Sequence, residues 1–486
     1  MRKEKILGSN CVWRNVQKAD MYFFCDFLIF GCLFASGFHY GYYCKYTYIY
    51  DNLWNHWFSL AGIALCLILS IGWCLRKYKK RKYLFENFYV IFYGLICSII
   101  SAVFLLTENV DISFYFIFIS MVIIYLPCYN YISLRVGSDG CRPARIALGN
   151  AMYFAGLTVG FVLFDELQPK VAGWTIFGIS LFFIIGIITN ECLHQCRCQD
   201  YKTSCDLVFN LLNEEKLVFA ERKSITALFV GRDDYCFKRN MQWFVVGLSG
   251  LIIAERCFFF SWSYLELMQS ATRGYTRGQE HLYLPYLLYT GGCVLSSLLM
   301  LRYKPKLIYL MFGLIKITIS AAILGVYSDG HTEDCFLFLC FYYISLGVYS
   351  SIGLQMLLEA TPLLYTELAV GIAFCMELGI MELLKFESKN DDYWSRLWIM
   401  TTVTICLTVI CIPLIQLYLP KSVGLIEIRN RLLGIHRQPV KSYDNRLWKN
   451  NFYLQMEIPT NAVSVALDKN RVFHQYPATE EKKTKF

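Results

Sequence analysis

Hydrophobic residues in this chain collect in long blocks, each about the length that an α-helix needs to cross a bilayer, roughly 20 residues. A polar stretch at 194–240 separates two sets of six blocks. The blocks lie near 21–43, 54–75, 88–106, 114–134, 147–164 and 172–193, and then near 241–263, 283–301, 307–326, 336–358, 368–384 and 397–419. The pattern predicts an all-α polytopic membrane protein with about twelve transmembrane helices in two six-helix bundles.

The order of polar and apolar stretches also predicts how the chain is divided. The predicted segments are an N-terminal tail (1–20), a first bundle (21–193), a linker (194–240), a second bundle (241–419) and a C-terminal tail (420–486). Basic residues crowd the loops on one side, as in RKYKKRK (76–82), and loops rich in Lys and Arg stay in the cytoplasm. We therefore expect both tails and the linker to be cytoplasmic, in the plasma membrane or an organelle membrane.

Composition excludes a soluble globular protein. Apolar types make up 56% of the residues and charged types only 17%, whereas a soluble domain has about 25% charged residues. The net charge of +9 comes from the loops, so no nucleic-acid partner is expected. Most of the 21 cysteines stand singly inside apolar blocks, where cysteine acts as a small hydrophobic residue. We expect neither a metal nor a cofactor.

Two short segments resemble motifs of known transporters. The loop GWCLRKYKKRK (72–82) resembles the G-x-x-x-D-R-x-G-R-R loop of the major facilitator superfamily: Gly72 and the basic run match, while Arg76 and Lys79 replace the acidic residue and the glycine. The segment EATPLLYTELAVG (359–371) resembles E-x-x-P-x-x-x-R-x-x-G-x-G of the organic ion transporter branch, with Thr366 in place of arginine. The resemblance implies a fold of two six-helix halves around a central cavity.

Six ionisable residues interrupt the apolar blocks, at a cost of about 2.5–3.5 kcal/mol or more each near the bilayer centre. The superfamily resemblance implies that helices one, four, seven and ten surround the cavity, with eleven partly lining it and nine outside. The candidate substrate- or proton-binding residues are therefore Asp26, Glu255, Glu377, Tyr349 and Gln355. The candidates for structural charge pairing are Arg256, Lys316 and Glu382. Asp26 could instead lie at a helix end, and the tyrosine and glutamine could be packing residues.

The leading functional hypothesis is a monomeric secondary transporter, not an enzyme. It would move a small organic solute, cationic or neutral, by alternating access, with protons as the candidate coupling ion. No GxxxxGK[ST] sequence that would bind ATP is present. One alternative is a transporter-like sensor or scaffold that no longer transports, which the replaced motif residues favour. The other is a membrane-embedded transferase, although only His39 and His56 lie in or beside the blocks.

Overall fold

The computed structural model describes most of the two predicted bundles. The described residues are 24–43, 53–77, 83–134, 142–166, 169–196, 283–328, 335–361, 365–387 and 393–418, with scattered residues between 247 and 271. They all belong to one compact unit, Asp20–Arg437. The two predicted tails, almost all of the linker and Arg256 lie outside the described residues.

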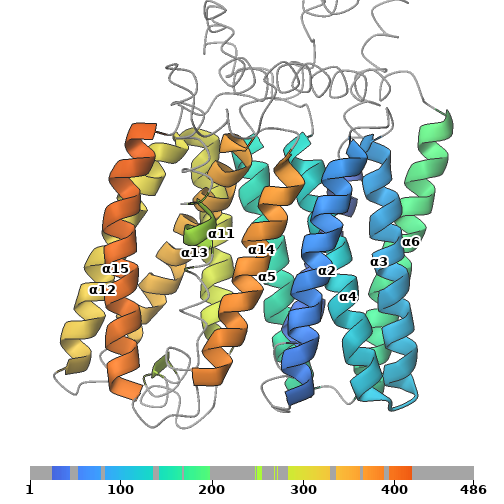
Figure 1. The fold of residues 1–486 in the computed structure, drawn as a ribbon, viewed down its shortest axis with the longest axis horizontal. Helices are drawn as coiled ribbons and strands as arrows, with labels where there is room; N and C mark the ends of the chain where they lie inside the picture. Colours follow the sequence, from blue (N-terminus) through green and yellow to red (C-terminus); the bar gives the residue numbers. More distant parts are fainter. Residues whose placement is uncertain are drawn as a thin grey trace, which may run out of the picture. The chain divides into compact units, whose positions relative to one another are not determined.

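In the described ranges, eleven long helices and one further helical segment follow the predicted blocks one for one (Figure 1). In the first bundle they are Phe24–Tyr43, α2 (Leu53–Lys77), α3 (Tyr83–Leu106), α4 (Val110–Leu134), α5 (Arg142–Glu166) and α6 (Pro169–Cys196). In the second bundle they are a helical segment that includes Glu255, α11 (Leu284–Arg302), α12 (Pro305–Ser328), α13 (Cys335–Ala360), α14 (Thr366–Glu387) and α15 (Tyr393–Tyr418). Nine helices in the described ranges are long and apolar enough to cross a membrane. The predicted fold class is confirmed, and the chain is a multi-pass integral membrane protein.

The helices extend beyond the apolar blocks at several ends. The helix α3 begins at Tyr83 and α5 begins at Arg142, each about one turn before the predicted block. Hydrophobicity marks only the part of a helix inside the hydrocarbon. Backbone hydrogen bonding continues into the headgroup region, where charged side chains are hydrated. The apolar pattern therefore underestimates helix length.

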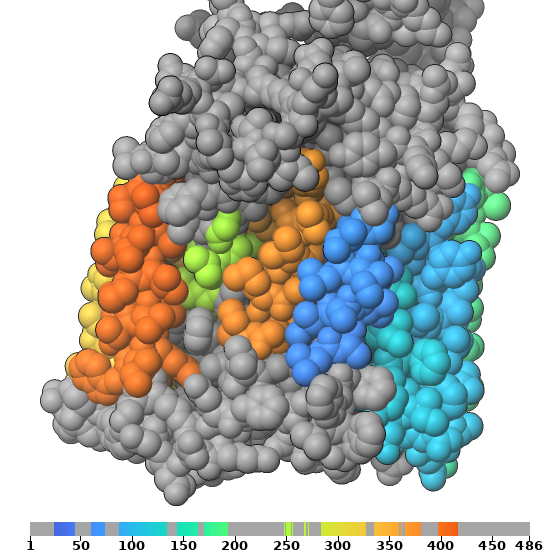
Figure 2. All heavy atoms as spheres, viewed as in Figure 1, coloured from blue at the N-terminus to red at the C-terminus, as the bar shows by residue number. Residues whose placement is uncertain are grey.

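The two bundles meet along two pairs of helices. In the first bundle α3 packs against α4 and α6, and in the second α13 packs against α11 and α12. Between the bundles, α5 packs along α11 and α2 packs along α14. Figure 2 shows the atoms of α2 and α14 side by side. Smaller contacts, of α5 with α13 and of α4 with α14, also belong to the boundary between the halves.

The helices differ in how much of their surface other helices cover. In the most apolar stretch of α4, 72% of the residues are buried, whereas in α6 the share is 39%. The large side chains Trp174, Phe182, Ile185 and Ile188 of α6 are exposed, as expected for a helix that faces lipid. The helix α4 is therefore central and α6 peripheral, although both sequences are strongly apolar.

Glycines allow the first helix and α5 to cross at backbone contact. A Cβ atom on Gly37 would overlap the carbonyl oxygen of Tyr153, and a Cβ atom on Gly156 would overlap the carbonyl oxygen of Phe34. Small residues commonly mark such close helix crossings in membrane proteins. Any larger residue at either position would push the two helices apart.

Candidate functional site

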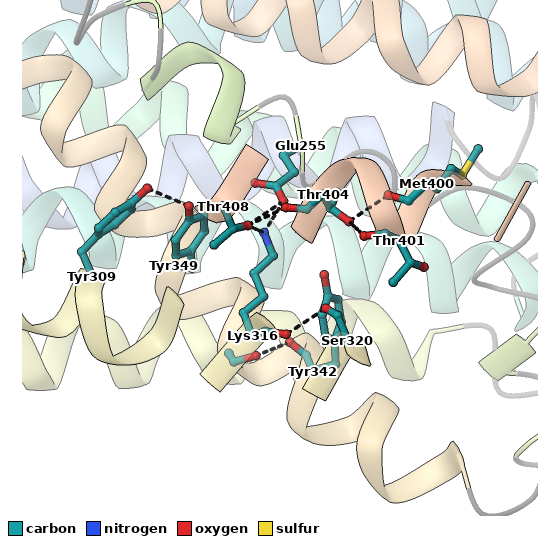
Figure 3. A network of polar contacts seen from close by, with 11 residues as sticks. Glu255, Tyr309, Lys316, Ser320, Tyr342, Tyr349, Met400, Thr401, Thr404 and Thr408 are labelled. Atoms are coloured by element: carbon teal, nitrogen blue, oxygen red, sulfur yellow. Dashed lines mark hydrogen bonds and ion pairs between the residues drawn. The ribbon is translucent and has the colours of Figure 1, made fainter. Parts of the chain in front are cut away.

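A buried ion pair lies inside the second bundle. Lys316 Nζ, midway along α12, donates a hydrogen bond to Glu255 Oε1 (Figure 3). Their side chains are 1% and 2% exposed. A charge removed from water in this way needs a partner, because an unpaired buried charge costs several kcal/mol. Each residue therefore stabilises the other in its charged form.

Two further side chains complete the surroundings of the Lys316 ammonium group. Its Nζ donates a second hydrogen bond to Thr408 Oγ1 on α15, at 3.0 Å. The Tyr349 ring on α13 lies 4.5 Å from Nζ, measured to the ring centroid, which is within the range of a cation–π interaction. The Tyr349 hydroxyl lies 2.7 Å from that of Tyr309. We call Glu255, Lys316, Tyr349 and Thr408 the charged core.

The charged core connects helices of one half only. Its residues come from α12, α13, α15 and the segment that contains Glu255 (Figure 3), all in the second bundle. A movement of one bundle against the other would leave these contacts intact. The charged core therefore holds the second bundle together and does not bridge the two halves.

The other predicted site residues lie at different places. Glu377 is buried on α14, Gln355 is buried on α13, and Asp26 is half-buried on the first helix. Gln355 lies six residues after Tyr349, so the two side chains point about 120° apart around α13. Glu382 belongs to α14, but its side chain, like Arg256, lies outside the described part. The structure therefore brings together three of the predicted residues, Glu255, Lys316 and Tyr349.

A second polar cluster, inside the first bundle, was not predicted from the sequence. His39 Nε2 lies 2.8 Å from Ser98 Oγ on α3, which in turn lies 2.7 Å from Ser180 Oγ on α6. Ser120 Oγ on α4 lies 3.4 Å from His39 Nδ1. We call these four residues the neutral core. Serine is common on every kind of helix surface, so only the packed structure reveals that two hydroxyls contact one imidazole and that a third reaches it through Ser98.

Neutral hydrogen bonds join the two halves along α5. Asn150 Nδ2 donates to Ser351 Oγ on α13 at 2.9 Å. Near one end of the same boundary, Ser297 Oγ on α11 donates to the Ala144 carbonyl oxygen at 2.9 Å. These side chains are uncharged and short, so each contact can be exchanged for another without burying an unpaired charge.

Aromatic rings pack where the halves meet. The Tyr125 ring of α4 stacks on Phe374 of α14 with centroids 4.2 Å apart, and Phe154 of α5 contacts Tyr289 of α11 at 4.3 Å. Tyr153 also meets Tyr125 edge to face. Such pairs add roughly 0.5–1.5 kcal/mol beyond the burial of their surfaces. The stacked rings therefore contribute to holding the two halves together.

Comparisons with known proteins find similarity in structure but not in sequence. No protein-family model matches the chain, and no curated protein matches it in sequence. The structure of the proton:xylose symporter XylE bound to 6-bromo-6-deoxy-D-glucose is similar, with a TM-score of 0.59 and 11% identity over 84% of this chain and 98% of that chain. The human organic anion transporter MFSD10 (TETRAN) has a TM-score of 0.50 and 14% identity over 80% of this chain and 98% of that chain. The chain therefore has the fold of the major facilitator superfamily.

Proposed function

We propose that the protein is a secondary transporter that moves a small organic solute by alternating access of its two bundles. The observation that carries this proposal is the boundary between the two bundles, where neutral hydrogen bonds and stacked aromatic rings make the contacts. The fold supports it, because transporters with two parallel six-helix halves rock one half against the other around a midplane site. Cytoplasmic termini belong to the same proposal and rest on the loop charges, and the plasma membrane is the proposed location.

The energies of the contacts favour movement at the boundary over movement inside a bundle. A neutral hydrogen bond contributes a net 0.5–1.5 kcal/mol, so bonds such as Asn150–Ser351 can break and be replaced by water or solute. Separating Glu255 from Lys316 would leave two buried charges unpaired, at a cost of about 3–5 kcal/mol. The halves are therefore expected to move as units.

The ion pair changes which carboxylate is the better candidate for binding a cation or a proton. Lys316 already neutralises Glu255, so Glu255 adds no net negative charge to the bundle. Glu377 is buried on α14, the helix that packs along α2 of the other half. It lies three residues after Phe374, so the two side chains point within about 60° of each other. We propose Glu377 as the group that attracts a cationic solute or carries a proton.

Uptake into proteoliposomes tests the function. Pooled metabolites are supplied with and without an inward proton gradient, and the parent is compared with Glu377→Gln, which keeps the shape and removes the charge. We expect the parent to accumulate a solute and the variant to lose either cation uptake or its pH dependence. Thr189→Ala on the exposed face of α6 is the control, because it changes neither the boundary nor a charge. A folded parent that takes up nothing would favour the sensor or scaffold function, and equal uptake by Glu377→Gln from pH 5 to 8 would exclude Glu377.

A further inference from the structure

Two thiols meet across the boundary between the halves. Cys66 lies on α2 and Cys375 on α14, and the two thiols lie close enough to interact electrostatically. Each thiol also reaches the backbone of the opposite helix: Cys66 Sγ lies 3.8 Å from the Gly371 carbonyl oxygen, and Cys375 Sγ lies 3.5 Å from the Ile63 carbonyl oxygen. The reciprocal contacts fix the register of the antiparallel pair: Cys66 lies against Gly371, about one helical turn from Cys375.

Small residues bring the two helices close enough for covalent chemistry. A Cβ atom on Gly371 would overlap the Ser70 hydroxyl of α2, so the backbones nearly touch one turn away from the thiols. A disulfide needs Cα atoms about 4.4–6.8 Å apart and sulfur atoms about 2.05 Å apart. Two thiols about one turn apart on helices packed this closely reach that geometry by rotation about their side-chain bonds and a small approach of the helices.

We propose that Cys66 and Cys375 are a redox modification site, which a peroxide converts into a disulfide that ties the two halves together. Both cysteines are reduced in the structure. The consequence for transport rests on the proposed function: a bond between α2 and α14 would prevent the halves from separating along this pair and would arrest alternating access.

The reaction needs one peroxide and releases two waters. One thiol loses its proton, and the thiolate attacks a peroxide oxygen. The O–O bond breaks, the cysteine becomes a sulfenic acid, and the departing hydroxide takes up the released proton and leaves as the first water. Cys375 is the better first nucleophile, since it is 7% exposed and Cys66 is 0% exposed. The Cys66 sulfur then attacks the sulfenic sulfur, the S–O bond breaks, and the proton of Cys66 leaves with the hydroxide as the second water. The two sulfurs together lose two electrons, which the peroxide accepts.

The chain offers a matched control pair inside one half. Cys32 on the first helix and Cys128 on α4 are both buried, and their thiols lie close enough to interact electrostatically. A bond between them would join two helices of the first bundle and leave the boundary free. The comparison therefore separates a link between the halves from the general effect of oxidising buried thiols.

The experiment uses the full-length protein in lipid nanodiscs, treated with hydrogen peroxide, quenched with N-ethylmaleimide and digested for mass spectrometry. We expect a peptide pair that links Cys66 to Cys375 and disappears after dithiothreitol. The variant Cys32→Ser/Cys128→Ser should keep this linked pair, and Cys66→Ser/Cys375→Ser should lack it. Backbone hydrogen exchange along α2 and α14 should slow on oxidation in the parent and stay unchanged in Cys66→Ser/Cys375→Ser.

The outcomes separate this inference from the proposed function. A folded parent that gives no Cys66–Cys375 peptide under peroxide would overturn the site. Where uptake is measurable, peroxide should lower it at least tenfold in the parent and in Cys32→Ser/Cys128→Ser, reversibly, and spare Cys66→Ser/Cys375→Ser. If the linked peptide forms but uptake and hydrogen exchange stay unchanged, the disulfide does not restrain the two halves, and that part of the proposal is wrong. If the reduced parent transports nothing, the transport proposal fails, while the peptide and exchange measurements still decide the disulfide.

Discussion

The two bundles carry polar cores on corresponding helices, yet the chemistry of the cores differs. The neutral core uses the first, third, fourth and sixth helices, and the charged core uses the seventh, ninth, tenth and twelfth. In this fold the halves are parallel repeats related by an axis along the membrane normal. The repeat thus explains where a polar core sits, but it does not decide which side chains fill it.

The difference predicts unequal tolerance to substitution. Around His39 every contact is between neutral groups, so losing one partner removes a hydrogen bond of roughly 1 kcal/mol. Around Lys316 the loss of one partner leaves a full charge buried in a helix bundle. Single substitutions should therefore damage the second bundle more than the first, and a paired substitution that removes both charges should be milder than either alone.

The largest effect is expected from Lys316→Met, which keeps the length of the side chain and removes its charge. Glu255 would then be buried without its cation, and the free energy of unfolding should fall by about 3–5 kcal/mol. The measurement is thermal unfolding of the purified protein in detergent, together with its yield in the membrane.

The matched double variant is Glu255→Gln/Lys316→Met. It removes both charges and should recover more than half of the stability that Lys316→Met loses. A Lys316→Met protein that melts at the same temperature as the parent would contradict the charged core as a stabilising pair.

A smaller effect is expected in the neutral core from Ser98→Ala. This change removes the hydroxyl that lies between His39 and Ser180 and should lower the stability by roughly 1–2 kcal/mol. Thermal unfolding again provides the measurement, with Thr189→Ala on the exposed face of α6 as the control. A loss as large as that of Lys316→Met would remove the contrast between the two cores.

The smallest effect is expected from Glu108→Gln in the turn between α3 and α4. Glu108 pairs with Lys170 at 2.8 Å, but both side chains are exposed. The hydrogen bond from Lys170 lowers the pKa of Glu108, so any stabilisation is present above the ordinary carboxyl pKa and disappears as the pH falls through the lowered value. Water screens such a pair. We expect no measurable change in melting temperature at pH 7. A clear fall in melting temperature would show that this exposed ion pair stabilises the protein as the buried pair Glu255–Lys316 does.

The sequence predicts the helices well because each helix contains an apolar block about 20 residues long. The sequence does not predict which helices pack against each other. Glu255 and Lys316 each stand out as costly charges in an apolar block, but they are 61 positions apart, and only packing decides that they meet. The central place of α4 and the peripheral place of α6 are also invisible, because both helices are apolar on most faces.

Residues without a charge leave still weaker signals. The serines of the neutral core and the thiols of Cys66 and Cys375 resemble many other small residues in apolar blocks. Their roles arise from register across helix pairs, and register is set by close contacts such as Gly371 against Ser70. Contacts between two helices cannot be inferred from the sequence of either helix alone.

The crossing of the first helix with α5 has a consequence for the synthesis of the protein. Gly37 and its partner Tyr153 are more than a hundred residues apart, so at about 5–20 residues per second the first helix is complete roughly 5–25 s before α5. During that interval its glycine face has no helix to cover it, and His39 lacks all three of its serines for part of the time. Substitutions there should consequently reduce the amount of protein made before they alter the finished fold.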